Sequence, residues 1–246
     1  FVFSLIYRSG DRSAFGLILL FSFIFFIIFK PLRKKTLLIF ALFLVISGFL
    51  SIHNPNIIKR NFLDTIGQFK GKYYESFLKK EANETNLGFM IFSFHHQTHY
   101  STAFRMFKDK PIFGHGVKMF RFECKNYEYV TPKDIKDVFN TTKKQYGCST
   151  HPHNTYMQLL SETGIVGFLF VISVFLILSF KLFKSIKNSQ EILPENVLII
   201  GIFINLWPII PTGNFFNNWL SMLYFIPISY YLYEINLKKK KVDRVI

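Results

Sequence analysis

Apolar residues in this chain gather in long, nearly uncharged runs rather than alternating with polar residues. Five such runs occur: Ala14–Phe29, Thr36–Ile52, Gly164–Phe183, Val197–Ile210 and Phe215–Tyr233. A helix needs about 20 apolar residues to cross the hydrocarbon layer of a bilayer, so these runs predict transmembrane helices. Two runs are short for a span, which indicates that one of them is a broken or tilted helix. The pattern therefore predicts an all-α polytopic membrane protein with about five full transmembrane helices.

The segments between the runs predict the domain organisation. Residues 1–7 are apolar but lack the basic start and cleavage site of a signal peptide, so they are interpreted as the end of an earlier span in a longer protein. We expect transmembrane helices with an outward Arg turn in 1–52. An outward-facing loop domain rich in short helices follows in 53–160, then further transmembrane helices in 161–235 and a basic cytoplasmic tail in 236–246.

The distribution of charge predicts the orientation. Basic residues cluster at 30–35, 181–187 and 238–241, and all three clusters fall on one side if the five runs alternate. The positive-inside rule makes that side cytoplasmic, and the long segment from about 53 to 155 then faces outward. Much of the net charge of +15 is this signature, so we do not expect nucleic-acid binding.

Both cysteines of the chain, Cys124 and Cys148, lie in the outward segment. Outside the cytoplasm a lone pair is most simply a disulfide. Two free thiols or half of a metal site are the alternatives. The polar residues 131–146 between the cysteines are expected to form a surface excursion beneath the disulfide.

A polar stretch, CSTHPHNTYMQLLSETGIVG, runs from Cys148 to Gly167 into the third apolar run. Polar and titratable residues at the mouth of a span are costly unless they serve a function. On a helix that begins near Asn154, the side chains of Asn154, Gln158 and Glu162 form one stripe. The structural alternative is a helix cap at the membrane interface, with Asn154 capping and Glu162 near the headgroups.

All seven histidines fall in the outward segment, which raises the question of a metal. His151 and His153, or His95, His96 and His99, could supply ligands. No CxxC or HExxH spacing accompanies them, and a solvated basic face accounts for most of these histidines. We therefore expect no metal and no cofactor.

Three motifs in order carry a resemblance to a known family. They are SGDRSAF before a span, AFRMFKDKPIFGHG in the loop, and HPHNTYMQLLSETGIVGFLF at the junction of loop and span. Together with short basic cytoplasmic turns, they resemble the C-terminal half of the O-antigen ligase/polymerase family of bacterial envelope proteins. The resemblance covers most of the 246 residues and does not separate ligases from polymerases.

The resemblance implies a metal-independent glycosyltransferase of the bacterial inner membrane. Such an enzyme moves a glycan from an undecaprenyl diphosphate carrier to an acceptor sugar on the periplasmic face. The acceptor is lipid A–core in a ligase and another carrier-linked chain in a polymerase. The family's loop His before Asn matches His153, and its Arg in the turn before a span matches Arg12. A second family Arg would fall near His96 and Gln97 and is missing, so His96, His99 or Arg105 would replace it.

The residues themselves are compatible with this chemistry. Displacing a diphosphate needs an activated acceptor hydroxyl and a stabilised leaving group. A neutral imidazole such as that of His153 can accept the hydroxyl proton, and guanidinium groups bind phosphates bidentately. The predicted diphosphate-binding residues are Arg12, Arg105 and Arg121. The residues expected to orient His153 or to bind sugar are Asn154, Gln158, Glu162, His96 and His99.

Two other interpretations of the sequence remain. A transporter of anionic lipid-linked sugars would use the basic outward loop as an electrostatic funnel. Charged residues inside the spans would favour it, and the five runs contain almost none. A non-catalytic scaffold of envelope assembly would leave the residues from His153 to Glu162 replaceable.

Overall fold

The computed structural model describes residues 2–69, 72–73, 85–86, 91–126, 129, 147–188 and 194–243. The predicted excursion of residues 131–146 lies outside these ranges. The chain divides into two compact units. Unit 1 comprises 1–54, 171–210 and 217–246, and unit 2 comprises 55–170 and 211–216.

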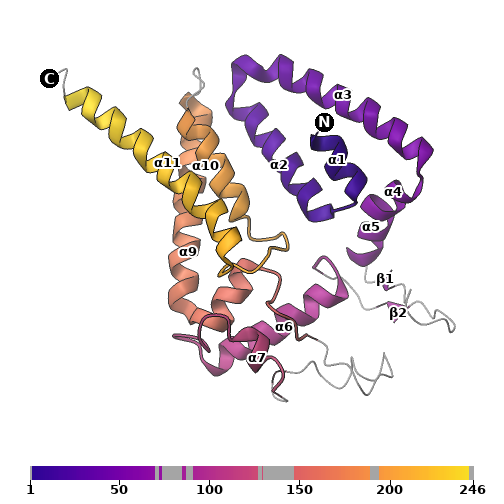
Figure 1. Cartoon of the computed structure of the whole chain (residues 1–246), viewed down its shortest axis with the longest axis vertical. Coiled ribbons are helices and arrows are strands. Elements are labelled where there is room, and N and C mark those ends of the chain that lie inside the picture. Colours follow the sequence, from indigo (N-terminus) through magenta and orange to yellow (C-terminus); the bar gives the residue numbers. More distant parts are fainter. Residues whose placement is uncertain are drawn as a thin grey trace. The chain divides into compact units, whose positions relative to one another are not determined.

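Helices make up nearly all of the regular structure in the described ranges (Figure 1). The all-α prediction is confirmed for the described residues, where β structure is limited to a two-residue antiparallel pair, β1 (Lys72–Tyr73) with β2 (Thr85–Asn86). The longer helices are α1 (Val2–Ser9), α2 (Arg12–Ile28), α3 (Arg33–His53), α6 (Phe94–Asp109), α9 (Thr155–Asn188), α10 (Pro194–Asn205) and α11 (Asn218–Asp243). The shorter ones are a 3₁₀ turn (Lys30–Leu32), α4 (Asn56–Ile58), a π-helical turn (Lys59–Leu63), α5 (Asp64–Phe69) and α7 (Phe120–Glu123).

Within unit 1, α1, α2 and α3 pack against one another (Figure 1). Their contact is aromatic, with the ring centroids of Phe3 and Phe43 5.4 Å apart. The hydroxyls of Tyr7 and Ser51 lie 2.8 Å apart within this contact. At the other end of α2, the Arg33 guanidinium donates to the carbonyls of Phe26 and Ile27. These carbonyls lack helical partners at a helix C-terminus, where a cation is also favourable.

The rest of unit 1 contains the later part of α9 together with α10 and α11. Aromatic side chains join α9 to the end of α10, where the rings of Phe175 and Phe203 stack 5.0 Å apart. Trp207 packs edge-on against Phe203. The hydroxyl of Tyr231 on α11 bonds to the Lys181 ammonium, which also lies over the Tyr231 ring.

Within the described residues, two helices are long and apolar enough to cross a membrane, Lys30–His53 and Thr155–Ile186. Arg12–Ile28 and Glu195–Asn205 are apolar but shorter. The predicted run to Ile210 extends beyond the end of α10 because Pro208 disfavours helical geometry at the preceding residue. Both the length and the apolar character needed for a span are therefore found for two of the five predicted spans, and the five-span topology remains a prediction.

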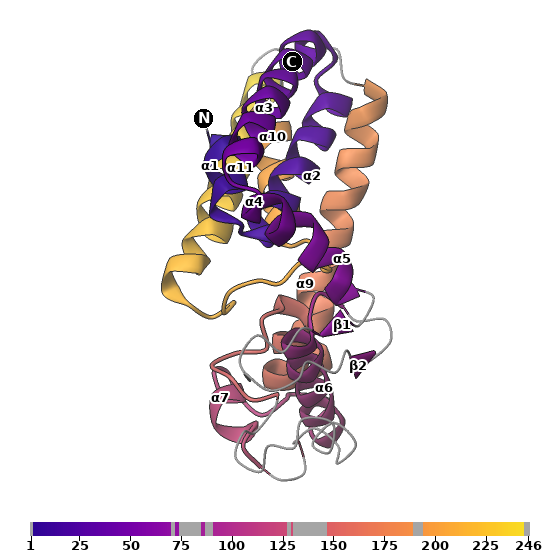
Figure 2. The same cartoon turned by 90° about the vertical axis from the view of Figure 1, so that its right-hand side faces the viewer.

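Unit 2 gathers α6, α7 and the first turns of α9 around a small core (Figure 2). The buried members of this core are Ala103, Met106, Phe120, Cys124 and Tyr129, and Cys148 and Met157 pack against it. Ser93 begins α6 as an N-cap whose hydroxyl accepts from the His96 amide. The core thus holds α6 and α7 against the start of α9, where the candidate site residues lie.

Candidate active site

The start of α9 is built on Asn154. Its side-chain oxygen accepts from the amides of Tyr156 (3.0 Å) and Met157 (3.1 Å), and the residue is buried. Asn154 is therefore an N-cap, the role that the helix-cap alternative gave it. The side-chain oxygen of Asn154 caps the helix, and the predicted orienting or sugar-binding role for Asn154 stays a prediction.

The polar stripe of α9 continues into a closed hydrogen-bond network. Gln158 Nε2 donates to Glu162 Oε2 (3.0 Å) and to Asn214 Oδ1 (2.8 Å). Gln158 Oε1 accepts from the Phe215 amide at 2.9 Å. Glu162 accepts from the amides of Lys118 (2.9 Å) and Phe120 (3.1 Å).

This network gives two further predicted site residues a structural role. Gln158 and Glu162 are only 0% and 1% exposed, and the bonds above use their polar atoms. Neither side chain bonds to His153, so they do not orient it, and neither is open to a sugar. The capping alternative placed Glu162 near the lipid headgroups, whereas its carboxylate is buried within this network. Their role is to hold the 211–216 segment and the loop before α7 against α9.

The glycine-containing turn Pro111–Gly116 packs against a break in the helical backbone of α9. Gly164 has φ +65°, a left-handed value, and this interrupts the helix. The freed carbonyls of Ser161 and Glu162 accept from the amides of His115 (3.0 Å) and Gly116 (2.9 Å). In return, the Ile165 amide donates to the carbonyl of Pro111 (2.8 Å).

Glycine is required on both sides of this contact. At Gly114, which also has positive φ, a Cβ would lie 2.6 Å from the Glu162 carbonyl oxygen. At Gly164 a Cβ would lie 2.7 Å from the Phe113 amide nitrogen. Only glycine permits both the left-handed backbone and the close approach. Two motifs that are some 50 residues apart in the sequence therefore form one structural element.

Three other imidazoles surround His153. Ring centroids of His151, His99 and His96 lie 4.1, 5.4 and 5.8 Å from that of His153. The structure thus brings His96 and His99 of α6 together with the HPHN turn. We call these four residues the histidine cluster.

His153 itself is held by its backbone. Its backbone φ is +57°, which is uncommon for a residue other than glycine. Residues in such conformations are often found at functional sites. Its carbonyl accepts from the Thr212 amide at 2.9 Å. Its ring is half-buried and has no hydrogen-bond partner among the described residues. The imidazole is therefore positioned by the turn while its nitrogens stay free for a ligand.

The histidine cluster disfavours protonation. Burial, followed by the charge of His151, lowers the pKa of His153 from 6.5 to about 4. Burial also lowers the pKa of His99 and the pKa of His151. Removing an imidazolium from water and placing it beside other cations both oppose its charge. His153 is consequently neutral at pH 7 and able to accept a proton.

The three predicted arginines are placed differently. Arg121 of α7 lies within electrostatic range of both His151 and Glu162, so its position agrees with a place beside the cluster. Arg105 follows His99 by six residues on α6, so the two side chains point about 120° apart around the helix axis. Arg12 begins α2 in unit 1, after the N-cap Asp11. The structure therefore brings Arg121 toward the histidines, while Arg105 lies on a different face of α6 from His99.

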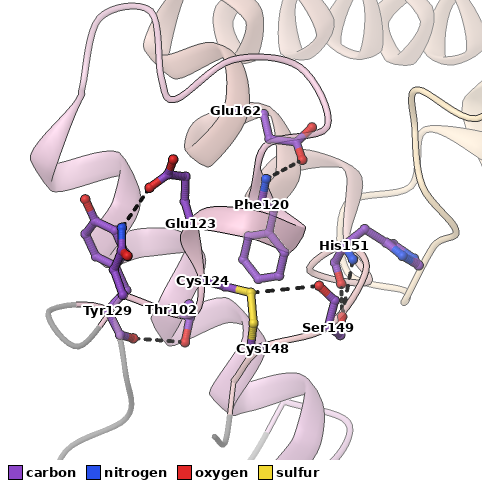
Figure 3. Close-up of a disulfide and its surroundings, with 10 residues drawn as sticks. Thr102, Phe120, Glu123, Cys124, Tyr129, Cys148, Ser149, His151 and Glu162 are labelled. Atoms are coloured by element: carbon purple, nitrogen blue, oxygen red, sulfur yellow. Dashed lines mark hydrogen bonds between the residues drawn. A yellow bond between two sulfur atoms is a disulfide. The ribbon is translucent and has the colours of Figure 1, made fainter.

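A disulfide between Cys124 and Cys148 ties α7 to the segment that leads into the HPHN turn (Figure 3). The Phe120 ring lies beside it, and the Phe120 amide donates to Glu162. After Cys148, the Ser149 hydroxyl donates to the His151 carbonyl. Disulfide, carboxylate and turn together tie the histidine cluster to the core of unit 2.

Among the described residues, no group of three or more His, Cys, Asp or Glu is arranged to hold a metal ion. The clustered imidazoles pack ring against ring. The chemistry available in this arrangement is proton acceptance by His153 and anion binding by Arg121.

Sequence reasoning missed the part played by the 211–216 segment. The Thr212 amide donates to the carbonyl of His153, just before α9, and Asn214 Oδ1 accepts from Gln158 Nε2 within it. A buried Asn between two apolar runs was the available signal, since a buried amide needs partners. The identity of those partners could not be predicted from the sequence.

The chain thus combines two helices long and apolar enough to cross a membrane with a half-buried histidine, His153, whose neighbour His151 lies within electrostatic range of Arg121. A family model described as O-antigen ligase matches residues 1–172. The chain belongs to this O-antigen ligase family, as its motifs predicted. Members are bacterial membrane proteins, glycosyltransferase-like enzymes that act on lipid-linked glycans and acceptors. No curated protein and no solved structure matches the chain.

Proposed function

We propose that this protein transfers a glycan from an undecaprenyl diphosphate carrier to an acceptor sugar on the periplasmic face of the inner membrane. The proposed acceptor is lipid A–core, which makes the protein a ligase. A polymerase that adds the glycan to another carrier-linked chain is the alternative within the same family. The observation that carries the proposal is His153, whose free, neutral ring is fixed by a left-handed turn.

In the proposed reaction His153 is the general base. The acceptor hydroxyl oxygen attacks the anomeric carbon of the donor sugar, and its proton passes to the free nitrogen of the imidazole. The bond from the anomeric carbon to the diphosphate oxygen breaks, and the diphosphate leaves as an anion with the bonding electrons. A base must be unprotonated before the step, which the lowered pKa of His153 ensures at pH 7.

The departing diphosphate needs positive charge close to it. Arg121 is the best placed of the described arginines, because it lies in electrostatic range of His151. We propose Arg12 as a second contact, from its match to the motif before a span. His96 and His99 lie against His153 and take the place of the missing second loop Arg. Arg105 is a weaker candidate because its side chain points away from His99.

The test replaces His153 in the full-length protein, expressed in a strain that lacks its own copy. His153→Asn is the informative variant, because Asn tolerates left-handed backbone and cannot act as the base. His53→Asn is the matched control, since His53 is an exposed histidine at the end of α3 in unit 1. Surface glycan and carrier-linked intermediates are both measured on gels, together with the amount of protein.

We expect His153→Asn to abolish surface glycan and to accumulate carrier-linked chains at normal protein level, while His53→Asn behaves as wild type. Short chains that still reach the surface would identify a polymerase instead. If the His153→Asn variant made wild-type amounts of surface glycan, the HPHN turn would have a purely structural role and the proposed mechanism would be wrong.

A further inference from the structure

The turn that docks into the break of α9 exposes large apolar side chains. We call Pro111–Lys118 the apolar turn. Ile112, Phe113 and Val117 are 58%, 75% and 53% exposed. Neighbouring exposed apolar residues on a protein surface usually mark an interaction site.

Hydrogen bonds place the apolar turn at the membrane end of unit 2. The amides of Ile165 and Val166 donate to the carbonyls of Pro111 and Ile112, at 2.8 and 3.4 Å. These amides belong to the first turn of an apolar run that contains no charged residue from Thr163 to Phe180. Each helical residue advances only about 1.5 Å, so the turn lies beside the first residues of this uncharged run.

The apolar side chains of the turn continue those of the helix. Val166 and Phe170, which follow the break, are 51% and 72% exposed. Both belong to unit 2, as does the turn. In a helix of this composition, outward apolar residues face lipid, and Ile112 and Phe113 begin beside them.

The charged residues around the apolar turn indicate which class of lipid it contacts. Lys108, Lys110 and Lys118 are exposed along the segment. The single acidic residue between 108 and 118 is Asp109, whose carboxylate lies 3.5 Å from His115 Nε2. Apolar residues flanked by lysines are typical of segments that lie in the interface of a membrane with anionic lipids.

We propose that the apolar turn is a membrane contact, in which Ile112, Phe113 and Val117 enter the outer edge of the hydrocarbon layer and the ammonium groups of Lys110 and Lys118 bind lipid phosphates. The occupant of the surface is the anionic phospholipid of the bilayer itself. This contact fixes the depth at which the turn, and through its backbone bonds the break in α9, is held relative to the membrane. It does not depend on the identity of the glycan or on the role of His153.

The test uses the full-length protein with p-benzoylphenylalanine in place of Phe113, reconstituted in vesicles of phosphatidylethanolamine and phosphatidylglycerol. The replaced ring is mostly exposed, so the substitution leaves the core intact. The same photoreactive residue at Asn126, an exposed position after α7, is the matched control. After irradiation, lipid adducts at each position are quantified by mass spectrometry.

Several-fold more lipid adduct at position 113 than at 126 is the expected result. Equal yields at the two positions, or adducts at 113 that join mainly to protein, would overturn the proposal. Lys110→Glu in the Phe113-replaced protein should lower the share of phosphatidylglycerol among the adducts. An unchanged share would refute the lysine–phosphate contact.

Discussion

The network around Glu162 allows a sharp prediction for Glu162→Gln. The carboxylate accepts three hydrogen bonds, two at Oε2 from Lys118 N and Gln158 Nε2, and one at Oε1 from Phe120 N. An amide has one acceptor oxygen. If that oxygen takes the Oε2 position, the two bonds there survive and the Phe120 amide faces an NH₂ group instead.

The magnitude follows from the donor that is left unpaired. Phe120 is buried, so its amide cannot turn to water. A buried polar group that loses its partner costs about 1–3 kcal/mol. For a chain of this size, about 1 kcal/mol corresponds to a shift of about 2–4 °C in Tm. We therefore expect Glu162→Gln to lower the Tm of the full-length protein by roughly 2–12 °C.

The assay is thermal unfolding in detergent, with Glu123→Gln as the matched control. Glu123 accepts from Asn126 Nδ2 at 2.7 Å in an exposed bond, which water can replace. Its substitution should change stability by less than about 0.5 kcal/mol. Equal Tm values for Glu162→Gln and Glu123→Gln would show that the buried network does not hold the loop, and the reasoning would fail.

Three further predictions rest on the same unit. Gly164→Ala should destabilise the protein in thermal unfolding, because it adds a side chain at positive φ against the turn, whereas Gly201→Ala has open space and should be neutral or stabilising. Replacing both Cys124 and Cys148 by Ser opens a loop with a sequence separation of 24. This should cost about 3 kcal/mol, and reductant on the wild type should match it in Tm. Between pH 6.5 and about 4 the unfolded chain binds a proton at His153 that the folded protein does not. The contribution of this group to stability is therefore present above pH 6.5 and is lost as pH falls to about 4. His153→Asn should flatten this part of the pH profile of Tm; an unaltered profile would contradict the lowered pKa.

The parts of the molecule predictable from sequence are those governed by local pattern. Uncharged runs predicted the apolar helices, because spanning or packing a helix requires apolar residues over a fixed length. The break at Pro208 shows the limit of this rule, since one residue shortened α10 within an apolar run. Family membership also followed from motif order, because it depends on residues and spacing alone.

The role of each polar side chain was less predictable. Helical spacing placed Gln158 and Glu162 on one face, and this geometry holds, since they bond to one another. The same spacing suited a substrate site equally well. Their partners are backbone amides of Lys118, Phe120 and Phe215, and any sequence supplies such groups.

The sequence by itself determined the helical class and the family, since both depend on composition and local order. Only the tertiary structure decided that His96 and His99 join His153 while Glu162 becomes a structural anchor. The reason is that burial and hydrogen-bond partners come from segments far apart in the chain. A left-handed Gly164 brings the Pro111–Gly116 turn to α9, and that docking determines which polar groups are enclosed and which, like the ring of His153, remain free to react.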